Sequence, residues 1–202
     1  KRNEKGTPLE FWAELKQFVE NMGMKFLLTP MSKMAAEKVN DLVDRWKIGS
    51  ADLTDYEMLR YIAETRKPVI LSTGMSTVPQ IQQALDVLTS HGSKITLMHC
   101  VSKYPCQENE LNLNTIRFFK KGFPKYKIGF SDHSLSIWSP AIAVAIEAKI
   151  IEKHFTLDRG AYGPDHKVSL LPEEFKEMVK NVRNVEAMLG TEDKLLLEEE
   201  KA

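Results

Sequence analysis

Two histidines stand where apolar runs give way to polar residues, and this placement could support metal chemistry. His133 follows the run 126–130, and His154 follows the run 148–151. Each run has the length of a buried strand, so each histidine is predicted at the carboxyl end of a strand. In barrels of alternating strands and helices, that end carries the catalytic groups. Two neutral imidazoles from neighbouring strands can hold a divalent metal ion and leave positions open for substrate.

Polar side chains also follow the other apolar runs, and together they favour a phosphorylated, anionic substrate. The predicted rim carries hydroxyls, a lysine, carboxylates and histidines: Thr29, Lys47, Ser50, Asp52, Ser72, His99, Ser102, Tyr104, Ser131 and Asp165. Lysine supplies positive charge, hydroxyls and loop amides supply hydrogen bonds, and Gly74 lets the backbone come close. A metal ion between the two histidines would polarise a carbonyl oxygen of a second substrate.

Six short apolar runs are predicted to form the strands that position these residues: 24–28, 45–48, 68–71, 94–98, 126–130 and 148–151. They recur at roughly the length of a βα unit. They are apolar throughout rather than alternating, which is typical of parallel strands covered on both faces.

The segments between the runs carry helix signals. Capping boxes are predicted at Thr7 with Glu10 and at Thr54 with Glu57. The first of these precedes an apolar stripe over 11–22, predicted to be buried, that ends at Gly23. Further helices are predicted over 78–90 and from Pro172 to Gly190.

This alternation predicts an α/β fold, specifically a TIM (β/α)8-type barrel. A complete barrel of this type has eight strands, so we expect this chain to lack the first two βα units. We expect residues 1–190 to form the N-terminally incomplete catalytic barrel and residues 191–202 to begin a linker to an absent C-terminal domain. Two open sheet edges invite pairing with another chain, so we expect an oligomer.

Composition argues against two classes of partner. The formal net charge is zero, which argues against a general nucleic-acid binder. No apolar stretch reaches membrane-spanning length, and the polar start 1–6 lacks a signal-peptide core, so we expect no membrane association and a cytoplasmic protein. Cys100 and Cys106 are expected to be free thiols.

Six motifs in order along the chain resemble the sialic acid synthase family. They are Lys47-Ile48-Gly49-Ser50, Ser72-Thr73-Gly74-Met75, His99-Cys100 with Tyr104-Pro105, Gly129-Phe130-Ser131-Asp132-His133, Glu152-Lys153-His154-Phe155-Thr156 and Gly163-Pro164-Asp165-His166. The resemblance implies a TIM barrel that condenses phosphoenolpyruvate with an N-acetylated hexosamine aldehyde. The products would be a nine-carbon 2-keto acid and phosphate. The metal would be manganese, with magnesium or cobalt as substitutes. The assembly would be a homodimer.

Matched residue by residue, the resemblance places His133 and His154 on the metal ligands. Positions that hold phosphoenolpyruvate match Thr29, Lys47, Ser50 and Ser131. Asp52 matches the carboxylate beside the sugar aldehyde, and positions that contact the sugar match Tyr104 and Asp165.

The chain departs from the family pattern in three ways. Asp52 stands where bacterial members carry Glu, and Ser102 stands where several members place Asn against phosphoenolpyruvate. The family's N-terminal strands supply a further catalytic glutamate and a substrate-binding lysine, which have no counterpart in this sequence. The family's C-terminal antifreeze-like domain has none either.

Other interpretations of the same residues stay open. The chain could be a truncated, non-catalytic barrel fragment, or a related synthase acting on a different surface-polysaccharide sugar. An aldolase-like barrel could use Lys47 as a Schiff base. At single positions, Asp52 and Asp55 could cap the helix predicted after Thr54, and a strand-end histidine could be structural.

Overall fold

The computed structural model describes residues 7–201, and a parallel sheet of five strands lies at its centre. The strands follow one another in chain order: β1 (Trp46–Ile48), β2 (Val69–Ser72), β3 (Ile95–Cys100), β4 (Lys127–Asp132) and β5 (Ile151–Lys153). All neighbouring pairs are parallel, so the chain crosses back after each strand, as the sequence predicts. The polar start 1–6 lies outside the described residues.

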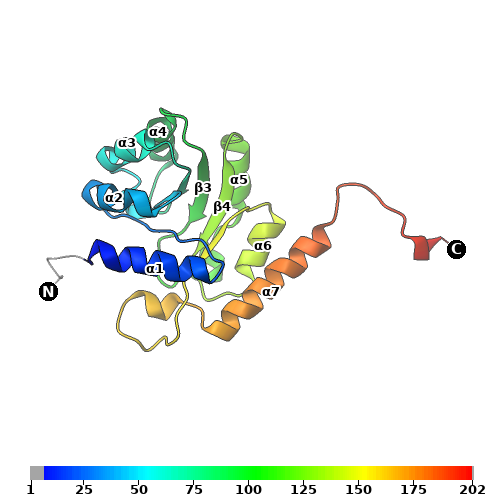
Figure 1. The fold of residues 1–202 in the computed structure, drawn as a ribbon. Helices are drawn as coiled ribbons and strands as arrows, with labels where there is room; N and C mark the ends of the chain where they lie inside the picture. Colours follow the sequence, from blue (N-terminus) through cyan, green and yellow to red (C-terminus); the bar gives the residue numbers. More distant parts are fainter. Residues whose placement is uncertain (1–6, 202) are drawn as a thin grey trace.

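The described residues form seven α-helices: α1 (Leu9–Asn21), α2 (Lys33–Val39), α3 (Tyr56–Glu64), α4 (Val78–Thr89), α5 (Asn114–Gly122), α6 (Ser139–Ala145) and α7 (Pro172–Leu189). Short 3-10 helices lie between them: η1 (Asn40–Leu42), η2 (Ser50–Asp52), η3 (Glu108–Glu110), η4 (Asp165–Val168) and η5 (Glu198–Glu200). Helices α3, α4 and α5 flank the strands on the outside of the sheet (Figure 1). None of the helices in this part of the chain is long and apolar enough to cross a membrane.

The core lies between the sheet and these outer helices. Trp46, Leu97 and Phe130 from the strands are fully buried in one cluster with Leu59 of α3 and Leu85 of α4. Burying an aliphatic or aromatic side chain of this size contributes about 1.5–3 kcal/mol. Apolar burial therefore fixes the strands whose carboxyl ends carry the polar rim.

The sheet is strongly curved. β1 and β5 lie at its two ends, with three strands between them. Nevertheless Lys47 Nζ of β1 lies 3.6 Å from Glu152 Oε2 of β5. Side chains from the two end strands can meet only if the sheet curls around a concave inner face, as the wall of a half-barrel does.

The predicted strand over 24–28 is wrong. Residues 24–30 have no regular structure, and Met24 and Leu27 are 52% and 39% exposed. The run lies beyond α1, and in residues 7–201 β1 is hydrogen-bonded to β2 alone. A further strand at this edge would be hydrogen-bonded to β1 on one side only. Pairing on one side is too little to hold so short a segment in an extended conformation.

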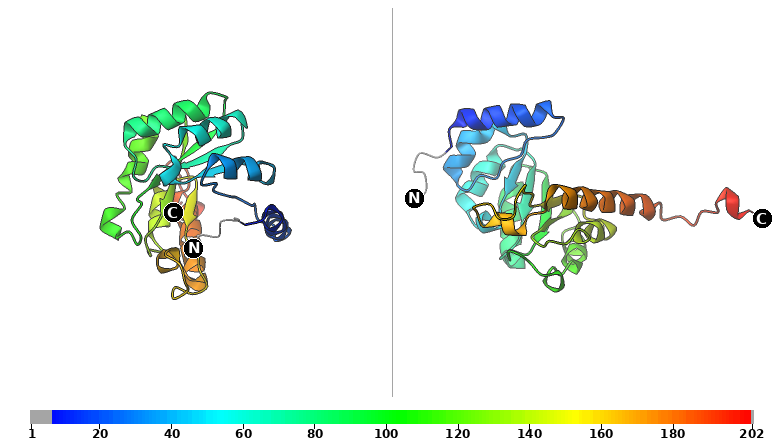
Figure 2. Two further views of the ribbon diagram at one scale, coloured as in Figure 1. Left: turned by 90° about the vertical axis from the view of Figure 1, so that its left-hand side faces the viewer. Right: turned by 90° about the horizontal axis from the view of Figure 1, so that it is seen from below.

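The predicted buried stripe of α1 is also wrong. No residue of α1 is buried, and Phe18 and Met22 are more than half exposed. The helix begins at Leu9 without a side-chain cap, so the box at Thr7 and Glu10 does not form. In the left view of Figure 2, α1, in dark blue, lies to one side of the sheet, and its contacts include the segment η1 that follows α2.

Three other helices bear out the sequence pattern in most respects. α4 begins at Val78 behind a capping box. α7 runs from Pro172 to Leu189 and ends at Gly190, whose φ of 54° suits a helix-terminating glycine. α3 differs in its cap, because Asp55 rather than Thr54 accepts a hydrogen bond, from the Met58 amide.

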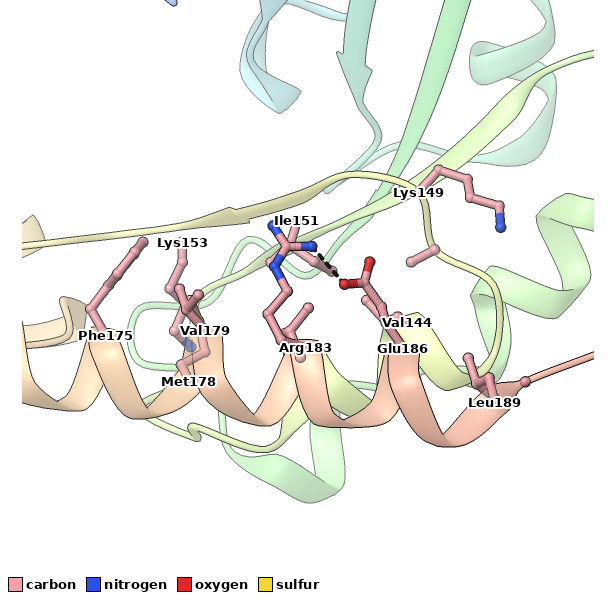
Figure 3. A pocket seen from close by; sticks show the side chains of 13 residues that line it. Val144, Lys149, Ile151, Lys153, Phe175, Met178, Val179, Arg183, Glu186 and Leu189 are labelled. Atoms are coloured by element: carbon pink, nitrogen blue, oxygen red, sulfur yellow. Dashed lines mark hydrogen bonds and ion pairs between the residues drawn. The ribbon is translucent and has the colours of Figure 1, made fainter. Parts of the chain in front are cut away.

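A groove of about 570 Å³ runs between the outer edge of β5 and helix α7. Figure 3 shows Phe175, Val179 and Arg183 of α7 facing Ile151 across it. Beyond α7, residues 191–201 extend away from the rest of the molecule (Figures 1 and 2).

Candidate active site

Alternation along β4 and β5 decides which side chains face the concave side of the sheet. Successive residues of a strand point to opposite faces. Ser131 and His133 therefore share one face of β4, and Glu152 and His154 share the same face of β5. Ser131 Oγ donates to Glu152 Oε1 at 2.7 Å, and the rings of His133 and His154 lie 5.3 Å apart between centroids. The structure thus brings the two predicted histidines together at the rim.

The tautomer of His133 follows from its hydrogen bonds. Its Nδ1 lies 2.7 Å from the carbonyl oxygen of Val101, so Nδ1 carries the proton and donates it. Nε2 is then an acceptor, and it takes a hydrogen bond from the hydroxyl of Tyr104 at 2.9 Å. Tyr104 also stacks on this ring, with centroids 4.1 Å apart.

The two histidines have opposite pKa shifts. Burial acts to lower the pKa of His133, but contact with the Cys100 thiol and the Val101 carbonyl outweighs it, and the pKa is raised. For His154, burial and the charge of His133 lower the pKa, despite Asp165 at 4.0 Å. His154 is therefore the more readily neutral of the pair, as a metal ligand must be.

Tyr104 and Asp165 lie at the solvent side of the histidine pair. Burial, followed by the charges of Cys100, Asp165 and Glu152, raises the pKa of Tyr104 to about 12. The phenol therefore stays a hydrogen-bond donor across the physiological range. Both side chains are exposed enough to meet a second substrate there.

Lys47 is held beneath this rim by three oxygen acceptors. Its Nζ donates to Ser72 Oγ at 2.8 Å and to the Ile48 carbonyl at 3.0 Å, and it lies 3.6 Å from Glu152. The side chain is almost completely buried. A buried ammonium beside the Ser72 hydroxyl, linked through Glu152 to the Ser131 hydroxyl, provides charge and donors for an anionic group.

The side chains of Ser50 and Ser102 both lie against Gly74, which explains why this position has no side chain. Ser50 Oγ accepts from the Gly74 amide at 3.0 Å and lies 3.4 Å from Cys100 Sγ. A Cβ on Gly74 would come within 2.1 Å of Ser102 Oγ and 2.9 Å of Ser50 Oγ, so only glycine fits. Burial acts to raise the pKa of the Cys100 thiol, but its contacts to His133, Ser50 and Ser102 lower it overall.

Asp52 and Thr29 lie together beside Gly49. A Cβ on Gly49 would come 3.3 Å from Asp52 Oδ2 and 3.7 Å from the Thr29 methyl. Burial and the nearby charge of Asp55 raise the pKa of Asp52. The alternative interpretation of Asp52 as the cap of α3 is wrong, because Asp55 fills that role. The structure gives Thr29 no hydrogen bond to the Lys47 or histidine groups.

Asp132 and His99 face away from the site, toward the helices. Asp132 accepts from the Ser134 amide at 2.8 Å and pairs with Lys153 at 2.7 Å, with both side chains buried. His99 Nε2 lies 2.7 Å from the Leu111 carbonyl, and its ring stacks on Phe130. Both residues therefore support the rim rather than line it.

The sequence did not single out Glu152 or Cys100 as parts of the site, although it placed Ser72 on the predicted rim. Glu152 connects Lys47 with Ser131, which makes it the link between the two ends of the sheet. A signal was present, because Glu152 directly follows the apolar run 148–151, two residues before His154, and must share its face.

The side chains at the rim supply some, but not all, of the ligands that a metal ion needs. Among the described residues, no group of three or more His, Cys, Asp or Glu side chains is arranged to hold a metal ion. His133 and His154 nevertheless offer two imidazoles on one rim, and Nε2 of His133 has the required lone pair. Two protein ligands with further positions left to substrate suit a catalytic rather than a structural metal site.

The fold and rim together define an α/β half-barrel with a paired-imidazole and lysine site at the carboxyl ends of its strands. The chain belongs to the NeuB family, whose model matches residues 2–194.

Known relatives agree with this assignment. The chain is 40% identical over 181 residues to the N,N'-diacetyllegionaminic acid synthase of Campylobacter jejuni, covering 88% of this chain and 54% of the relative. It is 35% identical over 187 residues to human N-acetylneuraminate-9-phosphate synthase, covering 92% and 52%. The chain thus spans about half the length of these curated relatives.

A solved structure shows the same fold. The crystal structure of N-acetylneuraminic acid synthetase from Leptospira borgpetersenii, in complex with citrate, superposes with a TM-score of 0.90 at 31% identity. The match covers 96% of this chain and 68% of that one. The parallel half-barrel of five strands is therefore confirmed as a synthase fold.

Proposed function

We propose that this protein condenses phosphoenolpyruvate with an N-acetylated hexosamine aldehyde to give a nine-carbon 2-keto sugar acid and phosphate. One observation carries the proposal: a histidine pair 5.3 Å apart stands on the same rim as a buried lysine hydrogen-bonded to serine. A metal ion held by the histidine pair suits a carbonyl substrate, and the buried lysine suits a phosphorylated anion. Membership of the NeuB family supports the choice of reaction.

The rim residues have complementary roles in this proposal. Lys47, with the Ser72 and Ser131 hydroxyls, binds the phosphate and carboxylate of phosphoenolpyruvate, and Ser50 and Ser102 line its other side. His133 and His154 hold a divalent cation, Mn²⁺ or else Mg²⁺ or Co²⁺, which supplies Lewis-acid polarisation of the aldehyde oxygen when bound.

The sugar lies at the outer end of the rim. Tyr104 and Asp165 contact it there, and Asp52, with Thr29 beside it, faces the aldehyde. Carbon 3 of phosphoenolpyruvate attacks the aldehyde carbon, water adds at carbon 2, and phosphate leaves with its C–O bond broken. Orientation of two reactants in one site supplies much of the rate.

A Schiff-base aldolase is disfavoured by the surroundings of Lys47. Three oxygen acceptors lie around its Nζ, the Ser72 hydroxyl, the Ile48 carbonyl and Glu152. This is the arrangement of a charged, anion-binding lysine, whereas a Schiff base needs a free amine.

The proposal extends to the assembly. We propose that a complete TIM barrel surrounds this site in the functional protein, and that the protein is a cytoplasmic homodimer. Two features support pairing: in residues 7–201, β1 and β5 each have one strand neighbour, and a groove lies along the edge of β5.

The direct test supplies the protein with phosphoenolpyruvate, Mn²⁺ and a panel of N-acetylated hexosamines. We expect mass spectrometry to show a nine-carbon 2-keto acid, with phosphate released in equal amount. Lys47→Gln should reduce turnover by at least about 100-fold because it removes the charge that meets the anion. Lys120→Gln, which alters an exposed lysine of α5 paired with Glu147, is the matched control and should retain activity.

Two results would contradict the proposal. No product with any sugar, in protein that is folded, would favour the non-catalytic fragment. Equal turnover of Lys47→Gln and Lys120→Gln would show that Lys47 is not part of the site. A preference within the sugar panel would identify which surface-polysaccharide sugar the protein makes.

A further inference from the structure

Lys153 is a buried cation on the face of β5 that points away from the candidate active site. It stands between Glu152 and His154, whose side chains face the concave side, so alternation turns Lys153 toward the helices. Its side chain is 1% exposed and lines the groove between β5 and α7 (Figure 3). Ile151, two residues earlier on the same face, packs against the hydrophobic core. Lysine is almost never fully buried unless it is paired, so its presence at this position needs an explanation.

The ammonium of Lys153 is held by the segment that leaves β4. Nζ donates to Asp132 Oδ2 at 2.7 Å, to the Ser134 carbonyl at 2.7 Å and to the Ser136 carbonyl at 3.2 Å. In residues 7–201 its hydrogen-bond partners all lie within 132–136, on both sides of His133. Hydrogen bonds from a charged donor are roughly twice as strong as neutral ones, so one side chain of β5 fixes the course of this segment.

Asp132 and Ser139 complete the network. One carboxylate oxygen of Asp132 accepts from the Ser134 amide at 2.8 Å, which folds the chain into an Asx turn around His133. The other accepts from Ser139 Oγ at 2.6 Å, within the first turn of α6. The network therefore joins the ends of β4 and β5 to the start of α6. We call its members the clamp: Asp132, Ser134, Ser136, Ser139 and Lys153.

His133 points to the other side of the sheet, where its contacts come from a different segment. Its carbonyl accepts from the Cys106 amide at 3.0 Å, and its Nδ1 donates to the Val101 carbonyl at 2.7 Å. Both partners follow β3, so these bonds form only when the end of β4 is placed correctly against them. The clamp supplies that placement from the opposite face. A metal-binding or catalytic group must be held to within roughly 0.5 Å of its productive position.

We propose that Lys153 is a positioning residue, which holds His133 through the clamp so that its imidazole meets that of His154. This inference rests on the proposed function, in which the two rings hold the divalent cation. An ion pair as buried as that of Lys153 and Asp132 is a poor source of stability, because desolvation offsets the attraction. What the pair provides is a backbone fixed at His133, which two apolar side chains in its place would not direct.

The first test is nitrogen NMR of the His133 imidazole in isotope-labelled protein, which requires neither metal nor substrate. The spectra are recorded at about pH 8.5, above the usual histidine pKa of about 6.5, so that the ring is neutral. In the unchanged protein we expect one signal of a protonated Nδ1 and one of a bare Nε2. In Asp132→Leu/Lys153→Met the ring should lose its bond to Val101 in part of the population and exchange between tautomers. We therefore expect its two nitrogen signals to move toward each other.

The second test is the affinity for Mn²⁺, followed by electron paramagnetic resonance. The double variant keeps both histidines, yet we expect it to bind at least about tenfold more weakly, the effect usual for groups that orient a ligand. Ser139→Ala is a milder variant, since it removes one hydroxyl of the clamp and its bond to Asp132. It should cause smaller changes in the same direction in both measurements.

Leu85→Ala is the control for simple loss of stability. Leu85 is fully buried in the core on α4, and its truncation leaves a cavity that destabilises the fold, as urea denaturation measures. We expect the His133 signals and the Mn²⁺ affinity of this variant to be unaltered. If Lys153 were purely structural, the disturbance of His133 would follow the loss of stability, and Leu85→Ala would be affected as much as a clamp variant of equal stability. That result would overturn the proposal.

The two measurements separate this inference from the proposed function. Unaltered Mn²⁺ binding and unaltered His133 signals in the double variant would overturn the role of Lys153 and leave the proposed reaction standing. Absence of Mn²⁺ binding in the unchanged protein would contradict the proposed metal site. Displaced His133 signals in the double variant would even then support Lys153 as the residue that positions the ring.

Discussion

His133 shows how one hydrogen bond sets the chemistry of a site. Because its Nδ1 donates to the Val101 carbonyl, its Nε2 faces the rim as a lone-pair donor. Tyr104 fills that position with its hydroxyl at 2.9 Å. Under our proposal the cation replaces the Tyr104 hydroxyl at Nε2. The loop from Val101 to Tyr104 therefore orients the imidazole and also covers it.

Asp132 allows a test of the residues that face the helices and support the rim from the other side of the sheet. Its carboxylate and the ammonium of Lys153 are 2.7 Å apart with side chains 0% and 1% exposed. Asp132→Asn leaves the lysine charge buried without its partner, so we expect a loss of about 3–5 kcal/mol in the free energy of unfolding. Urea denaturation measures it.

A double variant controls for simple loss of contacts. Asp132→Leu/Lys153→Met removes both charges, so it should be less destabilised than Asp132→Asn. If the single variant unfolds at the same urea concentration as the unchanged protein, the pair does not support β4 and β5.

His99 predicts a pH dependence of stability. Burial lowers its pKa, although the Leu111 carbonyl opposes this. Because the folded pKa lies below the unfolded value of about 6.5, the unfolded state binds the proton first as pH falls. The contribution of His99 is therefore complete above that pH and is lost progressively below it.

His99→Gln tests this sign, since the amide keeps a donor for the Leu111 carbonyl. We expect its free energy of unfolding to fall less between about pH 7.5 and about pH 5.5 (one unit either side of the free imidazole value of about 6.5) than that of the unchanged protein. Parallel pH profiles for the two proteins would show that His99 does not contribute.

At the scale of elements, apolar runs predicted five strands to within a few residues. The prediction succeeded because each of those strands is paired with neighbouring strands on both sides or is packed against helices. The run 24–28 has the same composition and forms no strand, because local sequence does not reveal whether a neighbour is present. The prediction of a buried stripe on α1 is wrong for the same reason. The apolar residues recur at helical spacing, but no other part of residues 7–201 packs against them closely enough to bury them.

Capping of α3 offers a sharp element-scale test. Asp55 accepts a hydrogen bond from the Met58 amide at 3.1 Å, whereas Thr54 makes no such bond. Asp55→Ala should therefore lower the free energy of unfolding by about 1 kcal/mol. Thr54→Ala is the matched control and should change it by less than about 0.5 kcal/mol. Thermal or urea denaturation that ranks the two variants in reverse would contradict the assigned cap.

For the whole molecule, curvature of the sheet is what brings the site together. Sequence reasoning could place Lys47 and Ser131 at strand ends, but it could not show that Glu152 connects them across the concave face. Such contacts depend on how far the sheet curls, which no local pattern encodes. Gly74 is similar, since its need for space appears only when Ser50 and Ser102 converge on it.

Open edges lead to a prediction about assembly. In residues 7–201, β1 and β5 each leave one edge unpaired, and unpaired edges favour association. We expect sedimentation equilibrium to give twice the monomer mass. Val179→Lys places a charge in the groove beside β5 and should weaken this dimer, while Phe118→Lys, on the distant helix α5, should not. A soluble monomer at all concentrations would contradict the expected homodimer.

Binding of Mn²⁺, followed by electron paramagnetic resonance, tests the central claim most directly. We predict that the protein binds one Mn²⁺ and that His133→Asn or His154→Asn weakens binding by at least about tenfold, since each removes one ligand. His91→Asn changes an exposed histidine at the end of α4 and should leave binding unaltered. Equal Mn²⁺ affinity in all three variants and the unchanged protein would contradict a metal site between His133 and His154.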